Sequence, residues 1–81
     1  MTARIEYGPP RKRSLTLRGH RTSVSLEDPF WAAFRALAAA AGKPVNALAA
    51  EIDEARGIDC GLAAAIRIYV LATLEAEARR G

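Results

Sequence analysis

Three hydrogen-bonding side chains occupy alternate positions of one short segment, Arg21, Ser23 and Ser25. In the stretch RTSVSL they alternate with Thr22, Val24 and Leu26. Successive side chains of a β-strand point to opposite faces, so the alternation predicts a strand with one polar and one more apolar face. The polar face carries one guanidinium, which only donates hydrogen bonds, and two hydroxyls, which donate or accept them.

Cationic side chains gather in the N-terminal part of the chain. Residues 1–26 carry six basic side chains and one acidic side chain, whereas residues 27–81 carry six basic and eight acidic ones, within a net charge of +3. A basic segment of this kind is typical of proteins that bind polyanions, although a solvated tail has the same composition. The cations that can contact a phosphate from this segment are Arg11, Lys12, Arg13 and Arg18.

No pattern in the sequence predicts catalysis or a metal site. The chain has no Gly-rich phosphate loop, no nucleophile elbow and no cluster of residues at metal-ligand spacing, so we expect no catalytic residue, no metal and no cofactor. Cys60 is the only cysteine, which fits a reduced, cytoplasmic compartment. No apolar run reaches the roughly 18 residues of a membrane span, so we expect no membrane partner.

The polar strand needs a backbone partner, and the segment before it offers one. Leu15 and Leu17 give residues 14–18 an alternating pattern of their own. In one continuous strand, however, these leucines would fall on the polar face described above. We therefore expect a turn or bulge near Gly19 and His20, with residues 14–18 forming a second strand or an ordered arm that folds back.

Three amphipathic helices follow the strand. The first is predicted to begin at an N-cap, Asp28, followed by Pro29 at the first helical position, and to end at Gly42. The second is predicted over residues 44–56, with Pro44 at its start, and the third over residues 60–78.

These elements form a single small domain over residues 14–78, preceded by a flexible basic arm over residues 1–13. A chain of 81 residues is marginal as an isolated fold, and oligomerisation is a common remedy. On the third helix, Ile68 and Leu71 widen the apolar surface beyond one face, which indicates a second packing partner.

The order strand, helix, helix resembles the ribbon-helix-helix superfamily of the MetJ, Arc and CopG repressors. The segment RTSVSLEDPFWAAFRALAAAAGKPVNALAAEI carries this resemblance, and GHRTSVSLEDPFW together with IRIYVL is similar to a family of small bacterial ribbon-helix-helix proteins. The resemblance implies a mainly α fold with a short β-ribbon, in which two chains pair their strands to form a homodimer, here with an additional C-terminal helix. The core residues implied for that dimer are Thr22, Val24, Leu26, Phe30, Phe34, Leu48 and Ile52.

The resemblance also implies a partner, double-stranded DNA. A two-stranded β-ribbon fits the major groove, where Arg21, Ser23 and Ser25 are expected to contact base edges. The family further implies a phosphate site at the start of the second helix, which here means Lys43 and the amides of Val45 and Asn46. The expected function is therefore sequence-specific DNA binding, as a transcriptional regulator.

Three alternatives stay open at this point. Pro44 removes one amide from the expected phosphate site, and the start of that helix, KPVN, lacks the usual Ser or Thr cap. A second register makes IRIYVL the second helix of the superfamily, with residues 44–56 as an insertion. Finally, the scaffold can serve as an antitoxin-like or adaptor module that binds another protein through the third helix or the ribbon.

Overall fold

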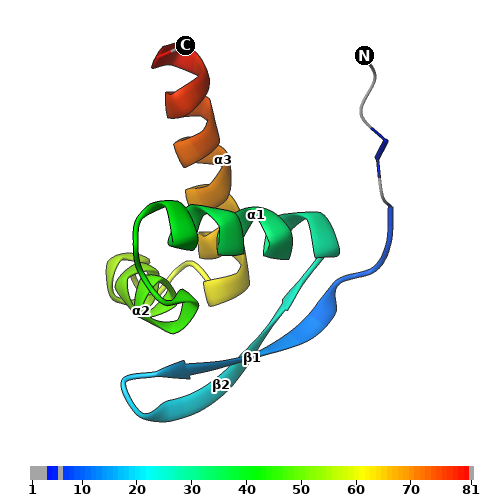
Figure 1. Ribbon diagram of the computed structural model, residues 1–81. Helices are drawn as coiled ribbons and strands as arrows, with labels where there is room; N and C mark the ends of the chain where they lie inside the picture. Colours follow the sequence, from blue (N-terminus) through cyan, green and yellow to red (C-terminus); the bar gives the residue numbers. More distant parts are fainter. Residues whose placement is uncertain (1–3, 6, 81) are drawn as a thin grey trace.

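A two-stranded antiparallel β-hairpin precedes three helices in the computed structural model, which describes residues 4–5 and 7–80 (Figure 1). The elements are β1 (Arg11–Leu17), β2 (His20–Leu26), α1 (Asp28–Ala40), α2 (Val45–Ala55) and α3 (Leu62–Arg80). The predicted fold class, mainly α with a short β-ribbon and an additional C-terminal helix, is confirmed.

The strand that carries Arg21 pairs with β1 of the same chain, in a register that sets Leu15 opposite Thr22. Arg18 and Gly19 form the two-residue connection, with φ angles of 51° and 84°. Positive φ at both central positions is the mark of a type I′ turn, whose twist matches that of a hairpin. The reversal expected near Gly19 is therefore confirmed.

The hairpin gives β2 a strand partner within its own chain. Residues 14–18 were expected to form a second strand or an ordered arm, and all of them except Arg18 lie in the strand β1. The short connection favours this pairing, because closing a two-residue turn orders very little extra chain. One boundary differs from the prediction, since β1 begins at Arg11 and so includes the last three residues of the expected arm. Other parts of that arm, residues 1–3 and 6, lie outside the described residues.

The start of α1 differs from the prediction by one residue. Glu27 is the N-cap, and Asp28 lies in the first turn without making a side-chain cap bond. The reason is that the carboxylate of Asp28 is engaged by Arg13 from β1. At the other end, Gly42 follows α1 with a φ of 70°, as expected for the residue after a helix C-terminus.

The two later helices also start after their predicted first residues. Pro44 is the N-cap of α2 instead of its first helical residue. α3 starts at Leu62, because residues 57–61 form an irregular connection in which the carbonyl of Cys60 accepts a hydrogen bond of 2.7 Å from Arg56.

The hydrophobic core lies where one face of the hairpin meets the three helices. Its buried members are Leu15, Val24, Leu26, Phe34, Leu37, Ala38, Leu48, Ala49, Ile52, Ala65, Ile66 and Val70. Five of the seven residues expected in the core of a dimer are buried within this one chain, and Phe30 is half-buried beside them. Thr22 is exposed in the single chain, since it lines an open groove of about 480 Å³ between the hairpin and α2.

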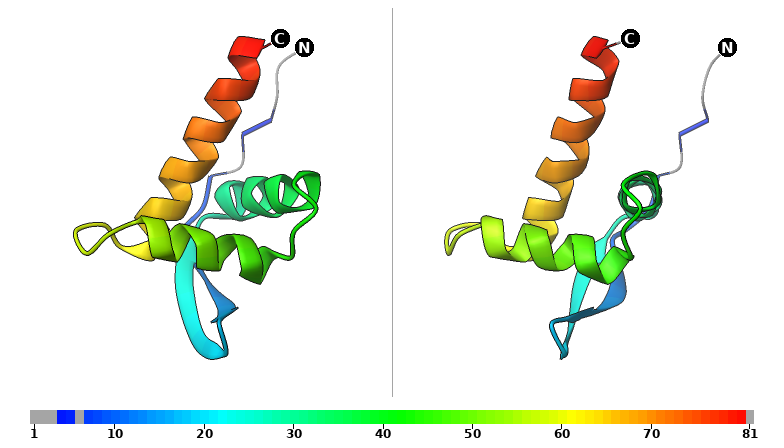
Figure 2. Two further views of the ribbon diagram at one scale, coloured as in Figure 1. Left: turned by 90° about the vertical axis from the view of Figure 1, so that its left-hand side faces the viewer. Right: turned by 60° about the vertical axis from the view of Figure 1, so that its left-hand side comes forward.

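The hairpin and α3 extend from opposite sides of the layer formed by α1 and α2 (Figures 1 and 2). α3 is buried only as far as Val70, and its second half extends away from the other elements. Along this helix Ile68, Leu71 and Leu74 are 62%, 58% and 43% exposed. Within the described residues, no helix is both long and apolar enough to cross a membrane.

Candidate nucleic-acid interface

The hairpin presents a continuous polar surface on the side opposite the core. Residues that face one another across two antiparallel strands share a face, and the register pairs Lys12 with Ser25, Ser14 with Ser23 and Thr16 with Arg21. We call these six residues the outer face. All six are exposed, so the two strands together form one polar strip along the ribbon.

The outer face carries two cations, Lys12 near α1 and Arg21 near the turn. Four residues of strand separate their positions, which places them roughly 13 Å apart along the ribbon. Neither side chain has an acidic partner in the part of the chain that the structure describes. The hydroxyls of Ser14 and Ser23 lie between the cations, so the strip is positive at both ends and neutral between them.

The basic run Arg11, Lys12 and Arg13 is divided by the strand. Lys12 belongs to the outer face, whereas Arg13 points to the inner face, where its side chain is only 17% exposed. Arg11 shares the face of Arg13, with its Nε 3.7 Å from a carboxylate oxygen of Asp28. The three cations were grouped as phosphate contacts in the sequence, but they do not share one surface.

Two other residues expected at phosphates form ion pairs with α2. Arg18 at the hairpin turn contacts Glu54. Lys43, in the loop before α2, donates to both carboxylate oxygens of Glu51 at 2.8 and 2.7 Å. Both pairs are exposed, with side chains 41–61% accessible, so a competing polyanion can reach these cations.

The start of α2 lies beside the β1 edge of the ribbon. The backbone amide of Thr16 donates to Asn46 Oδ1 at 3.0 Å, which fixes the first turn of α2 against the outer face. The described residues provide no acceptor for the amides of Val45 and Asn46, as expected in the first turn of a helix. The amides expected to bind a phosphate are thus adjacent to the residues expected to contact bases.

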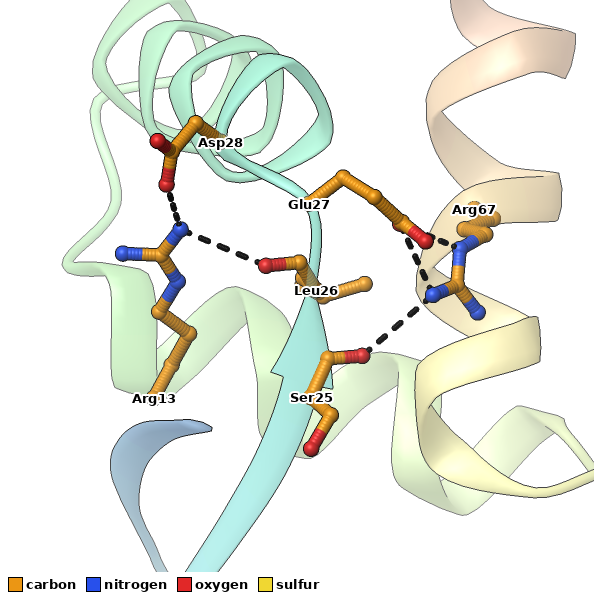
Figure 3. A network of polar contacts seen from close by, with 6 residues as sticks. All are labelled: Arg13, Ser25, Leu26, Glu27, Asp28 and Arg67. Atoms are coloured by element: carbon orange, nitrogen blue, oxygen red, sulfur yellow. Dashed lines mark hydrogen bonds and ion pairs between the residues drawn. The ribbon is translucent and has the colours of Figure 1, made fainter. Parts of the chain in front are cut away.

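Two arginines hold the junction between β2 and α1 from opposite sides (Figure 3). Arg13 of β1 bonds the carboxylate of Asp28 and donates to the carbonyl of Leu26 at 3.2 Å. Arg67 of α3 donates to Glu27 Oε1 from Nε at 3.0 Å and from Nη2 at 2.8 Å. We call the four charged residues Arg13, Asp28, Glu27 and Arg67 the junction clamp.

Each arginine of the junction clamp also lies over an aromatic ring of α1. The Cζ atom of Arg13 is 5.5 Å from the ring centroid of Trp31, and that of Arg67 is 5.7 Å from the ring centroid of Phe30. Cation–π contacts at this distance add to the ion pairs. The clamp therefore ties β1, α1 and α3 to the residues through which the ribbon enters the helical body.

The clamp lowers the pKa values of both of its carboxyl groups. For Asp28 the hydrogen bond from Arg13 is the largest cause, aided by the positive charges of Arg11 and Arg13. For Glu27 a hydrogen bond from its own backbone amide lowers the pKa most, followed by the hydrogen bond from Arg67. Both carboxylates are therefore ionised, and both ion pairs are present, at neutral pH.

Sequence reasoning missed the contribution of β1 to the outer face. Ser14 and Thr16 were not expected to contact a ligand, and Lys12 was expected at a phosphate instead of on the surface that carries Arg21. The signal was present, since KRSLTL alternates in the same way as RTSVSL. The alternation in β1 can be interpreted only when β1 is known to pair with β2, because the register decides which face of β1 lies on the same side as the polar face of β2.

The described residues include no group of three or more His, Cys, Asp or Glu side chains that could hold a metal ion.

Comparison with known families matches residues 10–74 to a family model described as the ribbon-helix-helix domain. No curated protein and no solved structure matched the chain. The family match covers the hairpin, α1, α2 and most of α3. With most of its length matched, and with a two-stranded ribbon followed by helices, the chain belongs to the ribbon-helix-helix family.

Proposed function

We propose that the protein binds double-stranded DNA by placing the outer face of the hairpin in the major groove, and that it acts in this way as a transcriptional regulator. Domains of its family typically bind DNA or have antitoxin-like roles, and they are regulatory folds instead of enzymes. The observation that carries the proposal is the outer face, in which six exposed polar side chains include two cations without an acidic partner among the described residues.

The dimensions of the hairpin suit this role. Two strands lie about 4.8 Å apart, and a ribbon of that width enters the major groove, which is about 12 Å wide. Lys12 and Arg21 lie roughly 13 Å apart along the strands, which corresponds to about four base-pair steps of 3.4 Å. One chain can therefore read a short segment of duplex with both strands of its own hairpin.

The chemistry of the outer face assigns different roles to its residues. The guanidinium of Arg21 can bond O6 and N7 of a guanine at once, which selects that base. Ser23 and Ser25 contact base edges with weaker selection, and Ser14 and Thr16 from β1 do the same. The amides of Val45 and Asn46 bind a backbone phosphate beside the groove, aided by the dipole of α2.

The proposal is tested with duplexes selected by the protein from a random pool, each compared with a scrambled duplex of equal length. Arg21→Ala should weaken binding to the selected duplex by roughly 1–3 kcal/mol, with a smaller loss on the scrambled one. Arg79→Ala is the matched control, because Arg79 is an exposed arginine in the last turn of α3, where this helix extends away from the other elements. An equal loss on both duplexes would remove the base-reading role of Arg21.

Failure of the wild-type protein to bind any duplex at low salt would overturn the proposal. That result would favour the second function considered above, a scaffold that binds another protein. Low salt is the correct condition because phosphate contacts release counterions and therefore weaken steeply as salt rises.

We further propose that the protein works as a homodimer in the cytoplasm, since its family typically forms dimers. The support within the chain is the unpartnered side of α3, where Ile68, Leu71 and Leu74 are exposed. A second copy that covers this side would bury three large apolar side chains, each worth about 1.5–3 kcal/mol when fully buried. Sedimentation of Ile68→Ser with Leu71→Ser should show a lighter species than the wild type, whereas a folded wild-type monomer would contradict the dimer.

A further inference from the structure

Arg13 lies between two residues of the outer face, Lys12 and Ser14, but points the other way. Its guanidinium is bonded at once to the Asp28 carboxylate and to the carbonyl of Leu26. Asp28 and Leu26 flank Glu27, the N-cap at which β2 passes into α1. Arg13 is therefore a direct side-chain link between β1 and the residues that set the direction of the ribbon relative to the helices.

The surroundings of Arg13 are unfavourable for a phosphate contact. Its side chain is 17% exposed, its guanidinium lies over Trp31, and its Nε is buried without an acceptor among the described residues. To reach a phosphate it would have to leave the Asp28 carboxylate and the Leu26 carbonyl together. By contrast Lys12, one position earlier, is exposed on the outer face.

We propose that Arg13 is a positioning residue, which acts through Asp28 and the Leu26 carbonyl to fix the angle at which the outer face meets DNA. The inference rests on the proposed function. It assigns the orientation of the outer face to one ion pair of the junction clamp, that between Arg13 and Asp28. If that pair is lost, the hairpin still forms, since its turn and strand pairing are separate from the clamp. What is lost is the fixed angle between the ribbon and α1 at the Glu27 junction.

The decisive variant is Asp28→Asn, because positioning and simple electrostatics predict opposite signs. Removing an acidic side chain makes the protein more positive, so a purely electrostatic effect would strengthen binding to every duplex. A positioning role predicts that binding to the selected duplex weakens by roughly two- to ten-fold, the range expected for one net hydrogen bond. Binding to the scrambled duplex should stay equal or increase, since it depends on phosphates and not on base contacts.

Glu54→Gln is the matched control for this charge change. Glu54 is also an exposed carboxylate that pairs with an arginine of the hairpin, Arg18, but it lies at the turn and not at the junction. Its loss should strengthen binding to both duplexes. A second variant, Arg13→Lys, keeps the charge but loses the planar guanidinium whose Nη2 donates to both acceptors and whose face lies over Trp31. It should lower discrimination between the duplexes while the dependence of affinity on salt stays as in the wild type.

Trp31 gives a readout that does not require DNA. It is the only tryptophan of the chain, and its ring lies under the guanidinium of Arg13. Asp28→Asn and Arg13→Lys should change the near-ultraviolet circular dichroism and fluorescence of Trp31, whereas Glu54→Gln should not. Stronger binding of Asp28→Asn to both duplexes, or a wild-type Trp31 spectrum, would overturn the inference. Absence of wild-type binding to any duplex would instead overturn the proposed function.

Discussion

Lys12 and Arg13 are neighbours in the sequence and carry the same charge, yet they lie on opposite faces of the hairpin. Lys12 is exposed on a strip of hydroxyls, with no acidic partner in the described residues. Arg13 is largely enclosed by Asp28, Leu26 and Trp31. The two faces of one small β-hairpin thus have separate tasks, the outer one suited to a ligand and the inner one to attachment.

The comparison shows that a run of basic residues is not one unit once it enters a β-strand. Alternation directs successive side chains to opposite sides, so only every second cation of such a run remains available to a partner. The other cations face the protein and must find carboxylates there, because an unpaired charge is costly away from water. Here the carboxylate of Asp28 is the partner of both Arg11 and Arg13.

The largest contrast between the two faces is expected in stability. Val24 on the inner face is 5% exposed, and Val24→Asp should lower the free energy of unfolding by about 3–5 kcal/mol, because the new charge has no partner in the core. Ser23→Asp, one position away on the outer face, should change it by less than about 0.5 kcal/mol. Urea denaturation of both variants tests the contrast, and similar midpoints would contradict it.

A smaller contrast is expected in the dependence of DNA binding on salt. If Lys12 contacts a phosphate from the edge of the outer face, Lys12→Ala should weaken binding to the selected and the scrambled duplex alike. The slope of the logarithm of affinity against the logarithm of salt concentration should become shallower by about one. Arg21→Ala should instead act mainly on the selected duplex. Titrations at two or more salt concentrations separate the two residues. A base-specific loss for Lys12→Ala would move this lysine from the phosphates to the bases.

The inner face is also expected to respond to acid. The folded state lowers the pKa values of Glu27 and Asp28, so their contribution is complete above the carboxyl pKa of the unfolded chain, which is about 4. It is lost as the pH falls through the lower values of the folded state. The urea concentration at the denaturation midpoint should therefore decrease as the pH drops below about 4. The decrease should be less steep in the double variant Glu27→Gln, Asp28→Asn. A wild-type slope in that double variant would exclude the clamp as the cause.

The smallest effect is expected from the ion pairs outside both faces. Glu51→Gln removes the partner of Lys43, and both side chains are about half exposed. The free energy of unfolding should change by less than about 1 kcal/mol, as is usual for exposed pairs. If Lys43 contacts a phosphate, its release should raise affinity for DNA slightly at low salt. A large loss of stability would show that this pair has a structural role.

Much of the fold follows from local patterns. The alternation in RTSVSL, the parity of Leu15 and Leu17 and the glycine at position 19 together predicted a reversal, and a tight hairpin is present there. The helices follow from their apolar spacing, and Phe34, Leu48 and Ile52, which the family resemblance implied as dimer core, are buried within the chain. The start of α1 was predicted less accurately. The reason is that the carboxylate of Asp28 has two possible partners, the free amides of its own helix and a distant arginine.

The sequence by itself determined which residues are polar, which alternate and where the chain can turn, because these depend on neighbours a few positions apart. Tertiary structure alone decided the register of the two strands, and the register places Lys12, Ser14 and Thr16 on one surface with Arg21, Ser23 and Ser25. It also decided that Arg13 binds Asp28, whereas Lys12 has no acidic partner among the described residues. The physical reason is that the free energy of pairing two distant groups depends on the packing that brings them together, which no local pattern specifies.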